Sequence, residues 1–156
     1  MMKINFFFTG KLRKSPELEL FEKYRFRFDK LGRNLHLGPV TVFEEDSKKN
    51  AKTFKNLFSS SGQRDRAYNI LLDEKGENYD SLEFANFLMK LRDDGTICLS
   101  FLVGGADGSK TEAIHSSDKL LSFGSMVWPH MLVRVMLMEQ LYRCATIISG
   151  LPYHRN

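Results

Sequence analysis

The residues best suited to chemistry on a nucleic acid lie at the end of the chain. Tyr153, His154 and Arg155 combine an aromatic stacking surface, a ring that titrates near neutral pH and a planar cation. RNA bases are recognised by stacking on aromatic rings and by guanidinium contacts, so these three residues are candidates for RNA binding and catalysis. A frayed terminus is the alternative interpretation, because chain ends are usually loosely held.

Two arginines precede this group on the last predicted helix. At about 100° per residue, Arg134 shares a face with His130, whereas Arg143 lies with Glu139 on roughly the opposite face. Glu139 and Arg143 have the spacing of an i,i+4 ion pair, which is a sufficient structural reason for both. The helix dipole disfavours a cation near the helix start, so we expect Arg134 to contact a ligand or another element. The surface between the two faces is apolar, which favours a dimer interface.

A glycine-rich turn, Gly104–Gly108, follows an apolar strand-like run. Glycines after a strand allow the backbone to approach a ligand, or they simply form a tight turn. The spacing matches neither a P-loop, because Ser109 rather than glycine precedes Lys110, nor a dinucleotide fingerprint. This argues against a phosphate-binding nucleotide enzyme. An uncharged adenosine group suits such a turn at least as well as a polyphosphate.

The loop Phe123–Trp128 is apolar and carries no charge. Loops in contact with solvent are usually polar, so we expect this one to be buried. Core packing, a subunit interface and an adenine pocket are all consistent with it. In an adenine pocket, backbone groups would recognise the edge of the base and apolar side chains would cover its faces.

Composition limits the class of protein. The 156 residues suffice for one domain with a substantial core, and the net charge of +4 is compatible with nucleic-acid binding without proving it. Cys98 and Cys144 are far apart and predict reduced thiols, and the four histidines form no metal signature, so no metal is expected. No segment has the length of a signal peptide core or a membrane span, so we expect a cytoplasmic protein.

The elements that must position these residues alternate between strand and helix. Apolar runs predict five strands, at Lys3–Thr9, His36–Glu44, Tyr68–Asp73, Thr96–Val103 and Lys119–Phe123. Helical spacing and capping residues predict helices at Pro16–Leu31, Ser47–Ser59, Ser81–Arg92, Lys110–Ser116 and Pro129–Ile148, with a loop at Lys75–Glu77. This alternation predicts an α/β fold with a mostly parallel sheet and helices on both faces. Ligands bind beyond the carboxyl ends of such strands, here Gly10-Lys11, Leu72-Asp73, Gly104-Gly105 and Phe123–Trp128.

Taken together, several motifs resemble the ribosomal RNA large subunit methyltransferase H family, a group of SPOUT-class enzymes. The resemblance spans essentially the whole chain, 1–156, as a single SPOUT domain. It is carried by the segments Thr9–Lys11, Leu102–Gly108, Pro129–Arg134, Glu139–Cys144 and Pro152–Arg155.

The resemblance implies a C-terminal trefoil knot, a homodimer, and S-adenosylmethionine as methyl donor. The implied substrate is a pseudouridine of large-subunit (23S) ribosomal RNA, methylated at N3. The implied cofactor contacts are Leu72, Gly104, Phe123, Gly124, Ser125, Met126, Val127 and Trp128, which coincide with three of the four strand ends. The implied RNA contacts are Arg134, Arg143, Tyr153, His154 and Arg155, of which the last four are also the catalytic candidates.

For the methyl transfer, the enzyme mainly supplies alignment, because the donor is already activated. His154 is the only tail residue with an ordinary pKa suited to removing the N3 proton. The sequence departs from the family pattern at Ala106-Asp107, where Pro-Glu is common, at Trp128, where an aliphatic residue is usual, and at Met131, where proline is common. These departures are the support for an alternative, an RNA- or ribosome-binding module with a degenerate, non-catalytic cofactor site.

Overall fold

The computed structural model describes residues 1–45, 51–62, 65–104 and 110–155. Its strands are β1 (Met2–Thr9), β2 (Leu37–Glu45), β3 (Ala67–Asn78), β4 (Cys98–Val103) and β5 (Lys119–Ser122). Its helices are α1 (Pro16–Gly32), the 3-10 turn η1 (Arg33–Leu35), α2 (Ala51–Gly62), α3 (Ser81–Asp93), α4 (Lys110–His115) and α5 (His130–Ile148). All five predicted strands and all five predicted helices are therefore present, and their described bounds lie within a few residues of those expected except at the end of β3.

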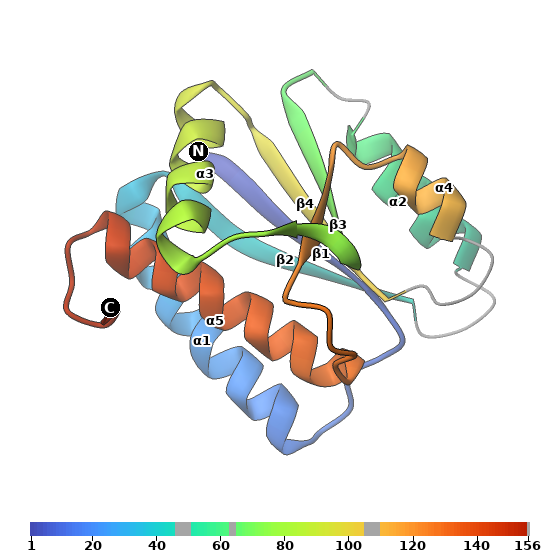
Figure 1. Ribbon diagram of the computed structural model, residues 1–156, viewed down its shortest axis with the longest axis horizontal. Helices are drawn as coiled ribbons and strands as arrows, with labels where there is room; N and C mark the ends of the chain where they lie inside the picture. Colours follow the sequence, from blue (N-terminus) through green and yellow to red (C-terminus); the bar gives the residue numbers. More distant parts are fainter. Residues whose placement is uncertain (46–50, 63–64, 105–109, 156) are drawn as a thin grey trace.

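The five strands form one parallel sheet in the order β2-β1-β4-β3-β5. Helices α1, α3 and α5 cover one face, and α2 and α4 cover the other (Figure 1). Side chains alternate accordingly, so Ile4, Phe6 and Phe8 of β1 join the larger core, whereas Phe7 packs against Phe58 of α2. The predicted α/β fold with a parallel sheet is confirmed.

Local capping explains where two of the helices begin. The hydroxyl of Ser15 accepts a hydrogen bond from the Leu18 amide at 3.2 Å, and Pro16 takes the first helical position of α1. At α3 the Asp80 carboxylate accepts from the Glu83 amide, and Glu83 accepts from the Asp80 amide, which forms a capping box. These contacts involve neighbours in sequence, which is why the sequence could predict them.

The loop predicted at Lys75–Glu77 is wrong, because β3 continues to Asn78. The strand bulges out after Leu72 and then pairs with β5 again, at Glu77 and Asn78. A Cβ on Gly76 would lie 2.6 Å from a backbone carbon of Leu120, so only glycine permits this close approach. The Lys119 ammonium, 2.7 Å from the Glu77 carboxylate, secures the second pairing.

Three expectations fall partly or wholly on residues that the structure does not describe. The start of the helix expected at Ser47–Ser59 and most of the glycine turn, including Ala106 and Asp107, lie outside the described residues. The trefoil knot depends on the complete path of the chain, including residues 105–109, so it stays a prediction. No helix of the described residues is long and apolar enough to cross a membrane.

Candidate functional site

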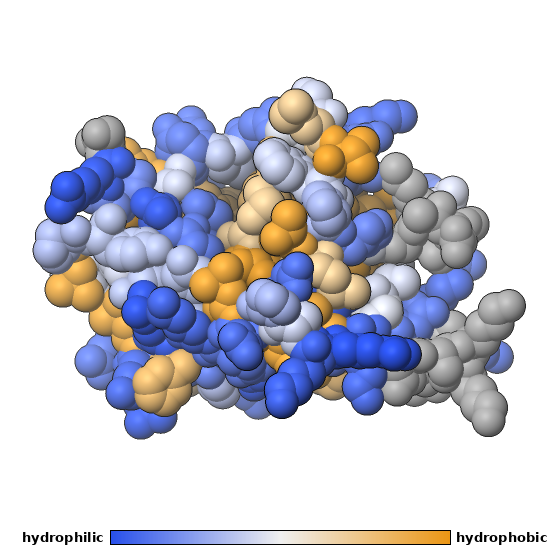
Figure 2. Space-filling model, turned by 90° about the horizontal axis from the view of Figure 1, so that it is seen from below, coloured by the Kyte–Doolittle hydropathy of each residue, from blue (hydrophilic) through white to orange (hydrophobic). Residues whose placement is uncertain are grey.

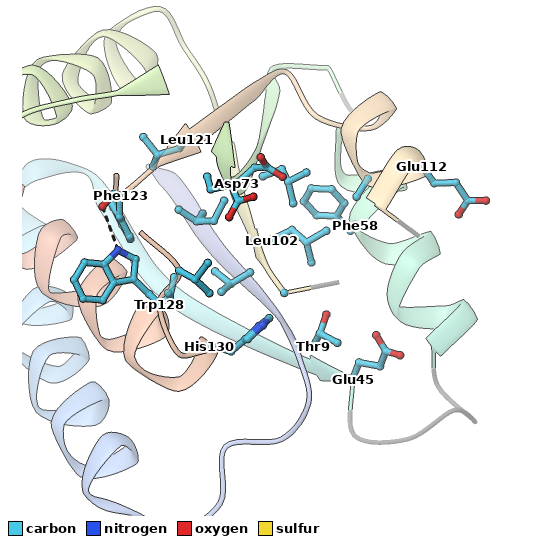
Figure 3. Close-up of a pocket in the computed structure, with 18 of the residues that line it drawn as sticks. Thr9, Glu45, Phe58, Asp73, Leu102, Glu112, Leu121, Phe123, Trp128 and His130 are labelled. Carbon is cyan, nitrogen blue, oxygen red and sulfur yellow. Dashed lines mark hydrogen bonds between the residues drawn. The ribbon is translucent and has the colours of Figure 1, made fainter. Parts of the chain in front are cut away.

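A cavity of about 360 Å³ opens at the carboxyl edge of the sheet. It lies among the ends of β1, β2 and β4, the bulge of β3, the loop after β5, and helices α2, α4 and α5 (Figure 3). Its volume falls in the range of small-molecule sites, and its position is the one at which parallel α/β sheets bind ligands. Among the predicted cofactor residues, Leu72, Gly104, Phe123, Gly124, Met126, Val127 and Trp128 line it, whereas Ser125 does not.

Gly104 lines the cavity where β4 closely approaches the end of β1. Its φ is +104°, a conformation that side chains strongly disfavour. A Cβ at this position would lie 2.8 Å from the Cβ of Thr9 and 3.4 Å from Nδ1 of His130. The ends of β1 and β4 and the start of α5 therefore meet at Gly104, and only glycine keeps this junction open.

The loop Phe123–Trp128 is not buried within the single chain, which corrects the sequence-based expectation. Met126 is 74% exposed and Val127 is 85% exposed. At the base of the loop, the hydroxyl of buried Ser122 accepts a hydrogen bond from the Gly124 amide at 3.0 Å. The Trp128 indole donates to the Phe123 carbonyl at 3.3 Å (Figure 3, dashed line). Packing against the core therefore accounts for Phe123 but not for the exposed Met126 and Val127.

The charge of the cavity lining opposes the charge of the whole protein. Among the described residues that line it are four carboxylates and one ammonium, whereas the chain carries +4 overall. Asp73 points into the cavity and Glu112 points outward at its rim (Figure 3). The other charged lining residues are Glu45, Glu74 and Lys55. Such a lining favours a ligand that carries positive charge and disfavours a polyphosphate.

Several lining residues were missed by sequence reasoning. Thr9 directly precedes one of the expected strand ends, Gly10-Lys11, whereas Glu45 ends β2, which was not among the strand ends singled out. Phe58 and Glu112 come from α2 and α4, and His130 from the first turn of α5. No local pattern distinguishes these three from ordinary helix residues.

Arg134 is buried, which is at odds with its predicted contact with RNA. Its side chain is 0% exposed. One terminal nitrogen donates to the carbonyl oxygens of Thr9 and Gly10, at 2.8 and 2.7 Å, and the other lies 3.3 Å from the Glu44 carboxylate. Its guanidinium carbon also lies 4.5 Å from the centroid of the Phe8 ring. The expectation that Arg134 contacts another element is confirmed, but in the single chain no surface of it is left for RNA.

The C-terminal tail is ordered because the end of α5 turns it back. Gly150 adopts a φ of +69°, and the Leu151 amide donates to the Thr146 carbonyl at 2.9 Å, as in a Schellman motif. The Tyr153 hydroxyl then donates to the Glu139 carboxylate at 3.0 Å. A frayed terminus is therefore excluded for this part of the chain.

The tail residues converge on Arg143. Its guanidinium lies 2.6 Å from Glu139, which confirms the predicted i,i+4 ion pair, and stacks 4.9 Å from the centroid of the Tyr153 ring. The hydrogen bond to Glu139 raises the pKa of Arg143, and burial is the main cause that raises the pKa of the Tyr153 hydroxyl. Both groups thus keep their protons at neutral pH.

His154 completes this cluster, with its Nδ1 3.3 Å from a terminal nitrogen of Arg143. Since an arginine can only donate, Nδ1 accepts this hydrogen bond and the proton of the neutral ring lies on Nε2. Arg155 is exposed at the end of the described chain. The structure therefore brings together Arg143, Tyr153 and His154, three of the predicted catalytic residues, whereas Arg134 is held elsewhere.

The tail and the cavity do not meet within one chain. None of the tail residues lines the cavity beside Gly104, whereas His154 lines a second hollow of about 770 Å³ between α1, α3 and α5. Among the described residues, the two cavities share only Leu121, Phe123 and Gly124. In the described part of the chain, no group of three or more histidine, cysteine, aspartate or glutamate residues is arranged to hold a metal ion.

Comparison with known proteins agrees with this geometry. Residues 2–154 match the family model described as "Predicted SPOUT methyltransferase". The chain is 46% identical to the "Ribosomal RNA large subunit methyltransferase H" of Dinoroseobacter shibae and 44% identical to that of Ruegeria pomeroyi, in each case over 99% of both chains. It is 41% identical to the protein of the same name from Caulobacter vibrioides, over 100% of both chains. The resemblance seen in the sequence motifs is thus confirmed over nearly the full length, and the chain belongs to the SPOUT methyltransferase family.

Proposed function

We propose that this protein transfers a methyl group from S-adenosylmethionine to N3 of a pseudouridine in large-subunit ribosomal RNA. The observation that carries the proposal is the cavity beside Gly104, which has apolar walls, acidic groups and open glycines at the carboxyl edge of the sheet. The names of the full-length relatives support ribosomal RNA as the substrate. Because ribosomal RNA is a cytoplasmic substrate, we place the protein in the cytoplasm.

The residues of the cavity fit this methyl donor. Leu72, Leu102 and Phe123 offer apolar contacts to an adenosine group, and Gly124 leaves open space above a backbone with φ of +106°. The carboxylates of Asp73 and Glu74 complement the positive charge of a sulfonium or an amino group. When bound, S-adenosylmethionine supplies an activated methyl group. The protein contributes binding, orientation and the exclusion of water.

The tail residues are suited to holding the target base. Loss of the N3 proton to solvent water spreads negative charge onto the two carbonyl oxygens that flank N3. Arg143 is a fixed cation, and His154 presents a proton on Nε2, so both can donate to such oxygens. In this tautomer His154 does not accept a proton at Nε2. We therefore assign it the role of donor in place of the general base expected from the sequence, while Tyr153 and Arg155 contact the RNA.

A homodimer would bring the two halves of the site together. Because the tail of one chain does not line its own cavity, the tail of a second copy would complete it. The exposed side chains of Met126, Val127 and Leu132 support such cover. Figure 2, seen from the side on which α1 and α5 lie in Figure 1, shows apolar groups reaching the surface in the middle of that face. Light scattering during gel filtration should give twice the chain mass of 18.0 kDa.

The function is tested with methyl-labelled S-adenosylmethionine and large ribosomal subunits from a strain that lacks this gene. We expect the protein to transfer label, and mass mapping of the RNA to place one methyl group on N3 of a pseudouridine. Calorimetry with S-adenosylmethionine alone should detect binding, which would show that the cavity is able to hold the cofactor. Ribosome binding without cofactor binding would contradict the proposal and favour the non-catalytic binding module.

A further inference from the structure

A row of cations with an exposed phenylalanine occupies the solvent side of the C-terminal half of α1. Lys23, Phe26 and Lys30 follow one another at spacings of three and four residues, so they share one face of the helix. Phe26 is 62% exposed, and the Lys30 ammonium lies 4.4 Å from the centroid of its ring. The core does not need this ring, because α1 buries Phe21 and Phe28 on its other side.

The cations of this half of α1 are available for an anionic partner. The nearby acids Glu22 and Asp29 both lie within ion-pair distance of Arg25, at 3.3 and 3.9 Å. By contrast, Lys23, Arg27 and Lys30 form no ion pair with a carboxylate in the part of the chain that the structure describes. All three are exposed. The positive charge on this surface is therefore not neutralised by the protein itself.

This surface is continuous with the tail. The guanidinium carbon of Arg27 lies 5.9 Å from the centroid of the Tyr142 ring, which in turn lies 4.8 Å from the ring of Tyr153. The guanidinium of Arg143 stacks on the Tyr153 ring in turn. Helices α1 and α5 run side by side in the same direction, so their C-terminal halves meet at the end of the molecule where the chain terminates (Figure 1). A continuous series of contacts between cations and aromatic rings thus runs from α1 to the proposed RNA-binding tail.

We propose that this α1 surface, defined by Lys23, Phe26, Arg27 and Lys30, is a second contact site for ribosomal RNA. The inference rests on the proposed function and extends it beyond the target nucleotide. Three cations would pair with phosphates of the RNA backbone, and an unstacked base would lie on Phe26. Phosphate contacts of this kind fix the register of a substrate, while the tail holds the base that is modified.

Single exposed substitutions test the surface without disturbing the core. Lys30→Gln is compared with Lys52→Gln, an exposed lysine on α2 across the sheet. Filter binding measures the dissociation constant for purified large ribosomal subunits at KCl concentrations from about 0.05 to 0.3 M. This range surrounds the roughly 0.1 M at which salt partly screens the interaction between surface charges. We expect Lys30→Gln to reduce the salt slope by about 0.7–0.9 and to raise Kd about five- to eightfold near 0.1 M. Lys52→Gln should change neither.

Phe26→Ala separates stacking from charge. It should raise Kd about tenfold, as expected for the loss of one base–aromatic stack, and leave the salt slope unchanged. All variants should bind S-adenosylmethionine as the wild type does. Unchanged Kd and slope in both Lys30→Gln and Phe26→Ala, with a wild type that methylates the subunits, would overturn this surface while the proposed function stands. Dissociation of the dimer by these variants would also overturn it, because the surface would then be a subunit contact.

Discussion

Replacing Arg134 by methionine distinguishes a contact within the protein from a contact with RNA. The change removes the guanidinium that joins the end of β1 to α5 but keeps an apolar side chain. Two charge-assisted hydrogen bonds, to Thr9 and Gly10, are lost, and Glu44 loses its cation. Burial lowers the pKa of Arg134 and Glu44 opposes this shift. An arginine guanidinium nevertheless stays protonated in proteins, so the contact with the Glu44 carboxylate is an ion pair.

The expected loss of stability in Arg134→Met follows from these contacts. Breaking a buried ion pair by removing one partner costs about 3–5 kcal/mol. The Glu44 side chain retains 27% of its exposure and can be solvated, so we expect the lower end of that range. For a chain of this size, each kcal/mol lowers Tm by about 2–4 °C, which predicts a decrease of roughly 10 °C. Affinity for S-adenosylmethionine should also weaken, because Thr9 and His130 line the cavity at either end of this link.

The assay compares urea unfolding, calorimetry with S-adenosylmethionine and the salt slope of ribosome binding. Arg134→Met should be less stable and bind the cofactor more weakly, with an unchanged salt slope. Arg155→Gln, an exposed cation of the tail, is the matched control and should show the reverse pattern, with normal stability and a smaller slope. If Arg134→Met were as stable as the wild type and had a smaller salt slope of ribosome binding, the reasoning would be refuted. Arg134 would then be a contact to RNA and not a contact within the protein.

Three further predictions concern the cavity and the tail. Gly104→Val should abolish S-adenosylmethionine binding and lower Tm, because its side chain would collide with Thr9; normal affinity in calorimetry would contradict the cavity assignment. Trp128 is the only tryptophan and lines the cavity, so titration with S-adenosylmethionine should change the intrinsic fluorescence; a flat titration at saturating cofactor would count against it. His154→Ala should lower the methylation rate more than it weakens cofactor binding, because neither His154 nor its partner Arg143 lines the cavity; equal turnover would remove His154 from the mechanism.

Much of the fold could be predicted because its signals are local. The apolar run of β1 and the Ser15 cap depend on neighbours in sequence, and so does the Glu139–Arg143 pair. The bulge of β3 could not be predicted in this way, since Gly76 marks a turn as readily as a close approach to another strand. The exposure of Met126 was also missed, because an apolar loop carries no sign of whether its own chain covers it.

The sequence by itself determined the alternation of strands and helices, the strand ends at which a ligand is expected, and the family motifs, including the one in the tail. Only the tertiary structure decided how these residues are grouped. Arg134 and Thr9 are separated by 125 positions, yet their hydrogen bond turns a predicted RNA contact into a buried link beside the cavity. The cavity and the tail lie apart in the single chain, although the loop Phe123–Trp128 and the tail are close in the sequence. The physical reason is that periodicity and capping act within a few residues, whereas the packing of parallel strand ends against α5 joins segments from the whole chain.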